Sequence, residues 1–229
     1  MNRTAKRALA AAAAAVIALG VADTAWASWD EAQLASDGET AYISGFPHAL
    51  SKVTGEIPLI TVERLDAEVP NAGVGTLGVD VVNYDTNAKQ ADSVRRRVRL
   101  DGVGFGSLLG VSDLDMANPF DISPAGGAAS EAQLTGTFPG TDEPATVVVT
   151  LRLVDGVLHM RPSLLMHAPA GQEEAVLRGA TLDLDTRELP LGGPADKVQL
   201  MGGSVELSHE RFNTAVTEED FSPTLGSHG

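Results

Sequence analysis

Apolar and polar residues alternate along most of the chain after residue 35, with the period of two that puts successive side chains on opposite faces of a β-strand. The pattern predicts strands with one solvent-facing side at Ile57–Val69, Leu77–Tyr84 and Ser93–Leu100. In the last of these, valine and leucine share one face and alternate arginines occupy the other. This part of the chain should therefore form half-buried strands.

A β-hairpin is the clearest predicted element. The segment ATVVVTLRLVDGVLHMRPSLLMH, Ala145–His167, has two apolar-rich arms around Asp155-Gly156, a dipeptide that suits a two-residue type I′ turn. Its first arm is apolar on both faces, so each face needs a cover. Two later segments, Ala175–Asp185 and Asp196–Phe212, predict at least three short strands, with a tight turn at Met201–Ser204.

Helix is favoured in three places: the apolar N-terminal region with its continuation to Ala35, a turn after Phe46, and Gly104–Val111. Ala117–Ser130 is rich in Pro, Gly and Ala, which predicts a loop. Since strands do not alternate with helices along the chain, the sheet should be antiparallel. The sequence thus predicts an α+β fold that is rich in β-strands and has short helices.

The N-terminus has the composition of an export signal. Three basic residues precede an apolar run, Ala8–Val21, and a small-residue cleavage motif, Ala25-Trp26-Ala27. The apolar run is shorter than the roughly 20 residues that span a bilayer, so a cleaved signal peptide is favoured over a signal anchor. We expect the leader at residues 1–27, a single domain at 28–212 and a mobile acidic tail at 213–229.

Composition narrows the range of partners. Residues 1–27 hold three of the 16 Lys and Arg and one of the 31 Asp and Glu, so the remainder carries 13 basic against 30 acidic residues, a net charge of −17. Such a charge repels nucleic acid and anionic bilayers over a Debye length of roughly 8 Å. The absence of cysteine excludes disulfides and thiol chemistry. We expect no nucleic-acid partner, and contact with a membrane surface through apolar residues or a local basic patch.

Motifs for catalysis or cofactor binding are weak throughout. Gly73–Gly78 matches the pattern G-x-G-x-x-G, but a strand is predicted after it, which favours a glycine-rich hairpin turn over a dinucleotide site. The pairs Asp113/Asp115 and Asp183/Asp185 lack a third oxygen ligand nearby and are typical of a solvated strand face. The histidines lack the close spacing of a zinc site, and no serine stands in a G-x-S-x-G motif. We predict no catalytic residue, metal site or cofactor.

The one basic cluster is Arg95-Arg96-Arg97 with Arg99. Alternation puts Arg95, Arg97 and Arg99 on one face of a strand, where their guanidinium groups suit a phosphate or a carboxylate. Charge balance with neighbouring Asp and Glu on a solvated face is the alternative.

An unusual turn follows in ISGFPHALSKVTGEIP, Ile43–Pro58. Gly45 permits a sharp bend, and Pro47 suits the first position of a helix. An apolar stripe then follows at positions i, i+4 and i+7, namely Phe46, Leu50 and Val53. Either this helical turn plugs one end of the sheet, or it gates an apolar cavity.

With this turn, the sequence resembles the LmeA-like phospholipid-binding proteins of the actinobacterial cell envelope. These share an export segment, a strand leading into G-F-P-F-L, a short helix ending in Gly and a β-rich remainder. The matching segments span about Ala41 to Leu207 and are ISGFPHALSKVTGEIPLITV, VRLDGVGFGSLLG, LTGTF, VDGVLHMRP and LPLGG with VQLMGGSVELS. His48 and Ala49 depart from the family, which favours Phe and Leu there.

The resemblance implies a secreted, non-enzymatic protein of the cell envelope or periplasm. Phospholipid would lie in the apolar groove of a curved antiparallel sheet that is wrapped on an N-terminal helix. The residues assigned to the acyl chains are a lip of Phe46, Pro47, Leu50 and Val53 and a rim of Val103, Phe105, Leu108 and Leu109. The residues assigned to the headgroup are Arg95, Arg97 and Arg99. We expect a monomer that can also meet an envelope protein.

Two other hypotheses stay open. The first is an envelope scaffold or chaperone-like interaction module with a filled core and no ligand. The second is a hydrolase assembled from distant strands, which requires His159, His167 or His209 to cluster with a Ser or an Asp.

Overall fold

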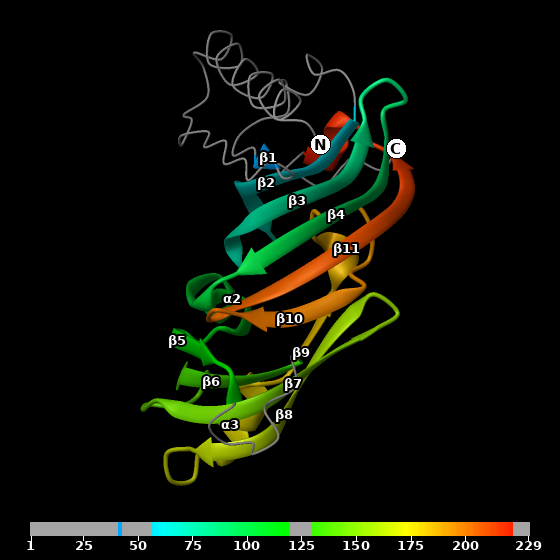
Figure 1. The fold of residues 1–229 in the computed structure, drawn as a ribbon. Coiled ribbons are helices and arrows are strands. Elements are labelled where there is room, and N and C mark those ends of the chain that lie inside the picture. Colours follow the sequence, from blue (N-terminus) through cyan, green and yellow to red (C-terminus); the bar gives the residue numbers. More distant parts are fainter. Residues whose placement is uncertain (1–40, 43–55, 120–129, 222–229) are drawn as a thin grey trace, which may run out of the picture. The chain divides into compact units, whose positions relative to one another are not determined.

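The computed structural model describes residues 41–42, 56–119 and 130–221, whose strands form two sheets (Figure 1). The strands of the six-stranded sheet, in spatial order, are β1 (Ala41–Tyr42), β2 (Glu56–Val69), β3 (Gly73–Asp85), β4 (Gln90–Leu100), β11 (Ser204–Ala215) and β10 (Lys197–Met201). The strands of the five-stranded sheet, in spatial order, are β5 (Ser112–Ala117), β6 (Glu131–Thr137), β7 (Ala145–Val154), β8 (Val157–His167) and β9 (Leu182–Asp185).

Helical structure is sparse in the described residues. It consists of two α-helices, α2 (Gly102–Leu109) and α3 (Glu173–Gly179), and two 3₁₀ turns, η3 (Thr186–Glu188) and η4 (Glu218–Phe221). No helix within the described ranges is long and apolar enough to span a bilayer. Together with the curved antiparallel sheets in Figure 1, this confirms the predicted β-rich α+β class. Strand β1 pairs with β2 in parallel over its two residues.

The chain divides into two compact units. One comprises residues 1–65, 77–96 and 210–222, and the other comprises residues 66–76, 97–209 and 223–229. In the described part of the first unit, the buried core is aliphatic apart from Tyr84 and Phe221. Its principal members are Ile60, Val62, Leu77, Val79, Val81 and Val94.

The second unit contains the whole five-stranded sheet. The odd-numbered residues of β7 face the core, and the register pairs them with buried residues of β6 and with buried or partly buried residues of β8. Strand β10 contacts β6 and β7 within this unit, helix α2 contacts β5, and helix α3 contacts β7 and β8. The predicted need for a cover on β7 is therefore met at least in part by other elements of the same unit.

Both predicted tight turns are confirmed. Asp155 and Gly156 have φ values of 51° and 79°, the left-handed conformation that a type I′ turn requires at both central residues. Gly202 and Gly203, with φ values of 53° and 77°, make the corresponding turn between β10 and β11. These turns fix the register of the strands that they join.

Several elements differ from the prediction. Helix α2 begins and ends two residues earlier than Gly104–Val111. Ala175–Gly179 is helical rather than extended, because Glu173–Gly179 forms α3. Gly73–Gly78 is not itself a turn: a turn at residues 70–72 precedes it, and the glycines belong to β3. The strand that follows still fits the exclusion of a dinucleotide site.

The C-terminal region is ordered further than predicted. Strand β11 continues to Ala215 and η4 follows, with Asp220 and Phe221 buried. The mobile tail predicted from Asn213 therefore does not begin before residue 222, and residues 222–229 lie outside the described residues. The predicted leader, the N-terminal helix and most of the Ala117–Ser130 loop also lie outside them.

Candidate lipid-binding site

Helix α2 carries the predicted rim and has well-defined ends. Asp101 accepts a hydrogen bond from the backbone N–H of Gly104 at 2.8 Å, which caps the N-terminus. Gly110 ends the helix with φ at 69°, a conformation that glycine adopts without strain. The Asp and Gly in RLDGVGFGSLLG therefore set the boundaries of the helix.

One side of α2 is made of glycine and lies directly against the neighbouring backbone. A Cβ atom added to Gly102 would come within 2.3 Å of the carbonyl oxygen of Leu114. One added to Gly106 would come within 2.8 Å of the carbonyl oxygen of Val111. Because these distances are shorter than any real Cβ contact, only glycine allows the helix to pack this closely on the start of β5.

The structure separates the four predicted rim residues. Phe105 is fully buried, Val103 is 79% exposed, and Leu108 and Leu109 are partly exposed. Residues two apart in an α-helix point about 200° away from each other, so Val103 and Phe105 face nearly opposite directions. Phe105 belongs to the core, whereas the other three reach the surface to different degrees. Their contact with lipid stays a prediction.

The four predicted lip residues, Phe46, Pro47, Leu50 and Val53, lie outside the described residues.

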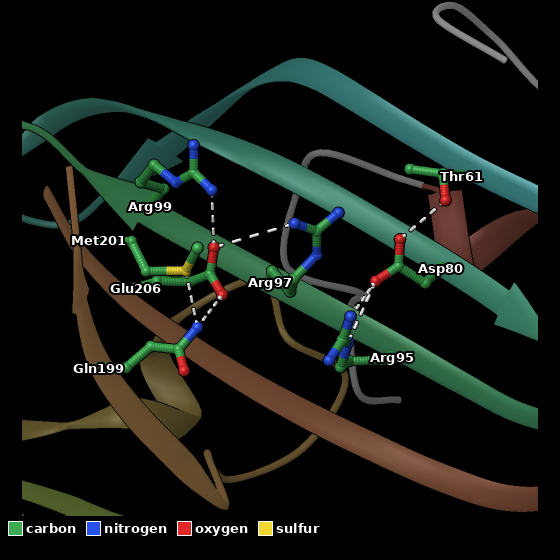
Figure 2. A network of polar contacts seen from close by, with 8 residues as sticks. All are labelled: Thr61, Asp80, Arg95, Arg97, Arg99, Gln199, Met201 and Glu206. Carbon is green, nitrogen blue, oxygen red and sulfur yellow. Dashed lines mark hydrogen bonds and ion pairs between the residues drawn. The ribbon is translucent and has the colours of Figure 1, made fainter. Parts of the chain in front are cut away.

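The first predicted headgroup residue, Arg95, is paired with a buried carboxylate in the first unit. Its Nε and Nη2 both donate to Oδ2 of Asp80, at 3.0 and 2.6 Å, and Thr61 donates its hydroxyl to the other oxygen at 3.1 Å (Figure 2). Asp80 is buried on β3, yet its two oxygens accept three hydrogen bonds. Arg95 therefore compensates a charge that would otherwise be costly to bury.

The other two predicted headgroup residues, Arg97 and Arg99, converge on Glu206 in the second unit (Figure 2). Arg99 Nη2 donates to Oε2 at 3.0 Å, and Arg97 Nη1 lies 3.8 Å from the same oxygen. Gln199 donates its amide N–H to Oε1 at 3.0 Å. Glu206 is buried in β11. Two guanidinium groups and one amide compensate its negative charge there.

The predicted faces of β4 are confirmed. Arg95, Arg97 and Arg99 alternate with buried residues, as the burial pattern along the strand shows. All three are paired with Asp or Glu, as expected if the arginines balance the charge of neighbouring acidic residues. A role in headgroup binding stays a prediction.

Arg96 points to the opposite, buried side of β4 and anchors η4 within the first unit. Its Nη1 donates to the backbone carbonyl of Glu219 at 2.8 Å, and nearby Arg211 pairs with Asp220. Burial lowers the pKa of Arg96; Asp220 opposes that shift and Arg211 adds to it. Sequence reasoning did not assign Arg96 a role, although its place among Val94 and Val98 was a signal of burial.

Two histidines lie close to aspartates, which fulfils part of what the hydrolase hypothesis requires. His159 Nδ1 lies 2.5 Å from Asp183, and His209 Nδ1 lies 3.4 Å from Asp196. Hydrogen bonds from His159 and then from Arg161 lower the pKa of Asp183. Within the described ranges, no serine or threonine hydroxyl is hydrogen-bonded to either imidazole, so the structure assigns neither pair a nucleophile.

The predicted solvated carboxylates are exposed. Asp113 and Asp115 lie at the surface, and Asp183 and Asp185 pair with basic neighbours there. Among the described residues, no three His, Asp or Glu side chains are grouped closely enough to hold a metal ion.

Comparison with known proteins identifies a family that matches this chain. The model of a family described as LmeA-like phospholipid-binding matches residues 5–210, which is most of the chain. Neither the search of curated proteins nor the search of solved structures found a match. The match covers α2, the arginines of β4 and all the strands up to β10, together with most of β11. The chain belongs to the LmeA-like phospholipid-binding family.

Proposed function

We propose that this chain is an exported, non-enzymatic protein of the cell envelope that holds or exchanges phospholipid, with the acyl chains in an apolar groove. The observation that carries the proposal is the family match over residues 5–210. The N-terminal basic and apolar segments support export. On α2, Val103, Leu108 and Leu109 are the candidates for contact with the acyl chains, and Phe46, Leu50 and Val53 are the further candidates that the sequence offers.

The energetics of exchange follow from the hydrophobic effect. Each methylene removed from water contributes about 0.8 kcal/mol, so a few methylenes suffice to favour a lipid in the groove over water. A bilayer offers the same burial, and the protein therefore gains little by extracting a lipid unaided. We infer that it exchanges lipid while in contact with a membrane surface.

Lipid mass spectrometry tests the proposal. The full chain is purified from its native cell envelope without detergent exchange and analysed for bound phospholipid. N-terminal sequencing of the same sample tests cleavage before Ser28. We expect phospholipid to be bound in a stoichiometric amount. Val103→Asp should lower the amount of bound phospholipid without changing the thermal midpoint of unfolding, because Val103 is exposed. A lipid-free protein that also ignores added phospholipid would refute the proposal.

The alternative is an envelope scaffold without a ligand. It predicts that Leu50→Asp weakens a protein complex or the fold and leaves any lipid signal unchanged. Our proposal predicts the reverse for the lipid signal, so the two hypotheses separate on this one variant.

A further inference from the structure

Two methionines of the described residues are exposed at the surface, and two are buried. Met166 and Met201 are 46% and 43% exposed, whereas Met116 and Met160 are 3% and 0% exposed. Oxidation of methionine to the sulfoxide requires that the oxidant reach the sulfur. Within the described part of the chain, Met166 and Met201 are therefore the methionines that an oxidant can reach while the protein is folded.

Met201 lies at an open end of β10, within the second unit. It is the last residue of the strand and pairs with Ser204 of β11, and Gly202 and Gly203 make the turn between them. A Cβ atom added to Gly202 would meet nothing within 4 Å. A small oxidant dissolved in water therefore has access to this end of the strand.

The amide of Gln199 occupies one side of the Met201 sulfur. The two residues are two apart on β10 and so share a face, and Gln199 Nε2 lies 2.7 Å from Met201 Sδ (Figure 2). The same nitrogen donates to Glu206 Oε1 at 3.0 Å, and Glu206 is the register partner of Gln199. The buried Glu206 therefore keeps the amide in place against the sulfur.

This contact makes the two lone pairs of the sulfur inequivalent. A thioether sulfur carries two carbon atoms and two lone pairs, and addition of oxygen to one lone pair or the other gives one or the other sulfoxide epimer. The Gln199 amide is directed at one lone pair, and no oxygen atom fits between two atoms that are 2.7 Å apart. An oxidant can reach only the other lone pair unless the amide moves away.

We propose that Met201 is a site of reversible oxidation by a hydroperoxide such as hydrogen peroxide, and that Gln199 directs the oxygen to one side of the sulfur, so that one sulfoxide epimer predominates. The sulfur lone pair attacks a peroxide oxygen, and the S–O bond forms as the O–O bond breaks. Sulfur is oxidised by two electrons and hydrogen peroxide is reduced to water, since the departing hydroxide takes up the proton of the transferred hydroxyl group.

The modification changes the acceptors of the Gln199 amide. Oxidised sulfur is poorer in electrons and accepts the N–H group weakly, so the amide keeps Glu206 as its acceptor. The ion pairs of Glu206 with Arg97 and Arg99 then persist. Because methionine sulfoxide reductases each act on one epimer, a single class of reductase suffices to restore Met201. The inference goes beyond the proposed function and does not depend on it.

Peroxide treatment of the folded full chain, followed by peptide mass spectrometry, tests this proposal. Cleavage after Lys197 and Arg211 leaves Met201 as the only methionine of its peptide. Portions of the digest are treated with one or the other of the two epimer-specific reductases, and the sulfoxide that each removes gives the epimer ratio. We expect one epimer of Met201 to exceed the other about fivefold, the factor that corresponds to the loss of one hydrogen bond.

Met166 is the matched control. Its exposure is nearly the same, and among the described residues no hydrogen bond reaches its sulfur, so its two epimers should form in similar amounts. The buried Met116 and Met160 should stay reduced. Gln199→Ala removes the amide and should bring the epimer ratio of Met201 to that of Met166. Circular dichroism and the thermal midpoint check that this variant is folded.

Oxidation of the wild-type chain in urea gives the same comparison without a substitution, because the contact between Gln199 and Met201 is lost on unfolding. Equal amounts of the two epimers at Met201 in the folded protein overturn the proposal, as does a Met201 that stays reduced while Met166 is oxidised. An excess of one epimer that persists in Gln199→Ala or in urea overturns the role of Gln199, since the selectivity then has another source.

Discussion

Substitution of Glu206 by Gln removes a buried charge on which two arginines converge, while the size of the side chain is kept. The variant loses the charge-assisted hydrogen bond from Arg99 at 3.0 Å, worth about 1.5–3 kcal/mol, and the attraction to Arg97 at 3.8 Å. Breaking a fully buried pair costs about 3–5 kcal/mol. The side chains of Arg97 and Arg99 are 13% and 42% exposed, so water partly compensates them, and glutamine still accepts a hydrogen bond. We expect Glu206→Gln to destabilise the protein by about 2 kcal/mol.

Thermal and urea denaturation measure this effect. A loss of about 2 kcal/mol lowers the melting temperature by about 4–8 °C in a chain of this size. Glu174→Gln is the control: Glu174 pairs with Arg178 on the exposed face of α3, and such pairs contribute almost nothing. The difference between wild type and Glu206→Gln should persist in about 1 M salt, because buried pairs are weakly screened.

A double-mutant cycle with Arg99→Gln isolates the pair. We expect a coupling free energy of about 1 kcal/mol between positions 99 and 206. If Glu206→Gln stays within about 0.5 kcal/mol of the wild type, or if the cycle gives no coupling, the idea that Glu206 holds these arginines in place is refuted.

Three further predictions concern local contacts. Asp101→Ala removes the N-terminal cap of α2 and should cost about 1 kcal/mol of unfolding free energy in urea denaturation, whereas Asp101→Asn should recover most of it; equal stability of the two variants would contradict the capping role. Gly106→Ala should destabilise by about 1–3 kcal/mol despite alanine's higher helix propensity, because its Cβ would meet the Val111 carbonyl at 2.8 Å; a stabilised variant would show that α2 and β5 pack more loosely. Asp183→Asn should lose stability relative to the wild type at neutral pH. The folded pKa of Asp183 is lowered, so its contribution is present above the ordinary value of 3.8 and is lost as the pH falls below it; a difference that does not shrink in acid would exclude this ion pair as the cause.

The sequence predicted well the features that depend on neighbouring residues. The Asp155-Gly156 turn follows from two residues that accept positive φ, and the faces of β4 follow from alternation alone. Helix α3 was missed because its seven residues continue into the alternating Leu182–Asp185, and its helical state depends on packing. A Cβ at Gly179 would lie 3.1 Å from Phe138, a contact across about forty residues of sequence.

Side-chain contacts between residues far apart in the sequence could not be predicted from the local pattern of residues. Arg99 and Glu206 are 107 positions apart, and Arg96 and Glu219 are 123 apart. The acidic composition after Asn213 suggested a tail, yet Asp220 and Phe221 are buried there. Charge composition describes an average over a segment, whereas one ion pair and one aromatic side chain suffice to hold its first residues in place.

Glu206 also limits how a lipid headgroup could bind at Arg97 and Arg99. A phosphate that displaced this carboxylate would leave it buried without its cations, at a cost of several kcal/mol, and would gain only an equivalent pairing with the same two arginines. Exchange of one anion for another is therefore unfavourable at this position. A headgroup could be added only on the exposed side of Arg99, while Glu206 keeps its own hydrogen bonds. In that arrangement Glu206→Gln should strengthen the binding of anionic lipid even as it weakens the fold, because the arginines lose a competing negative charge.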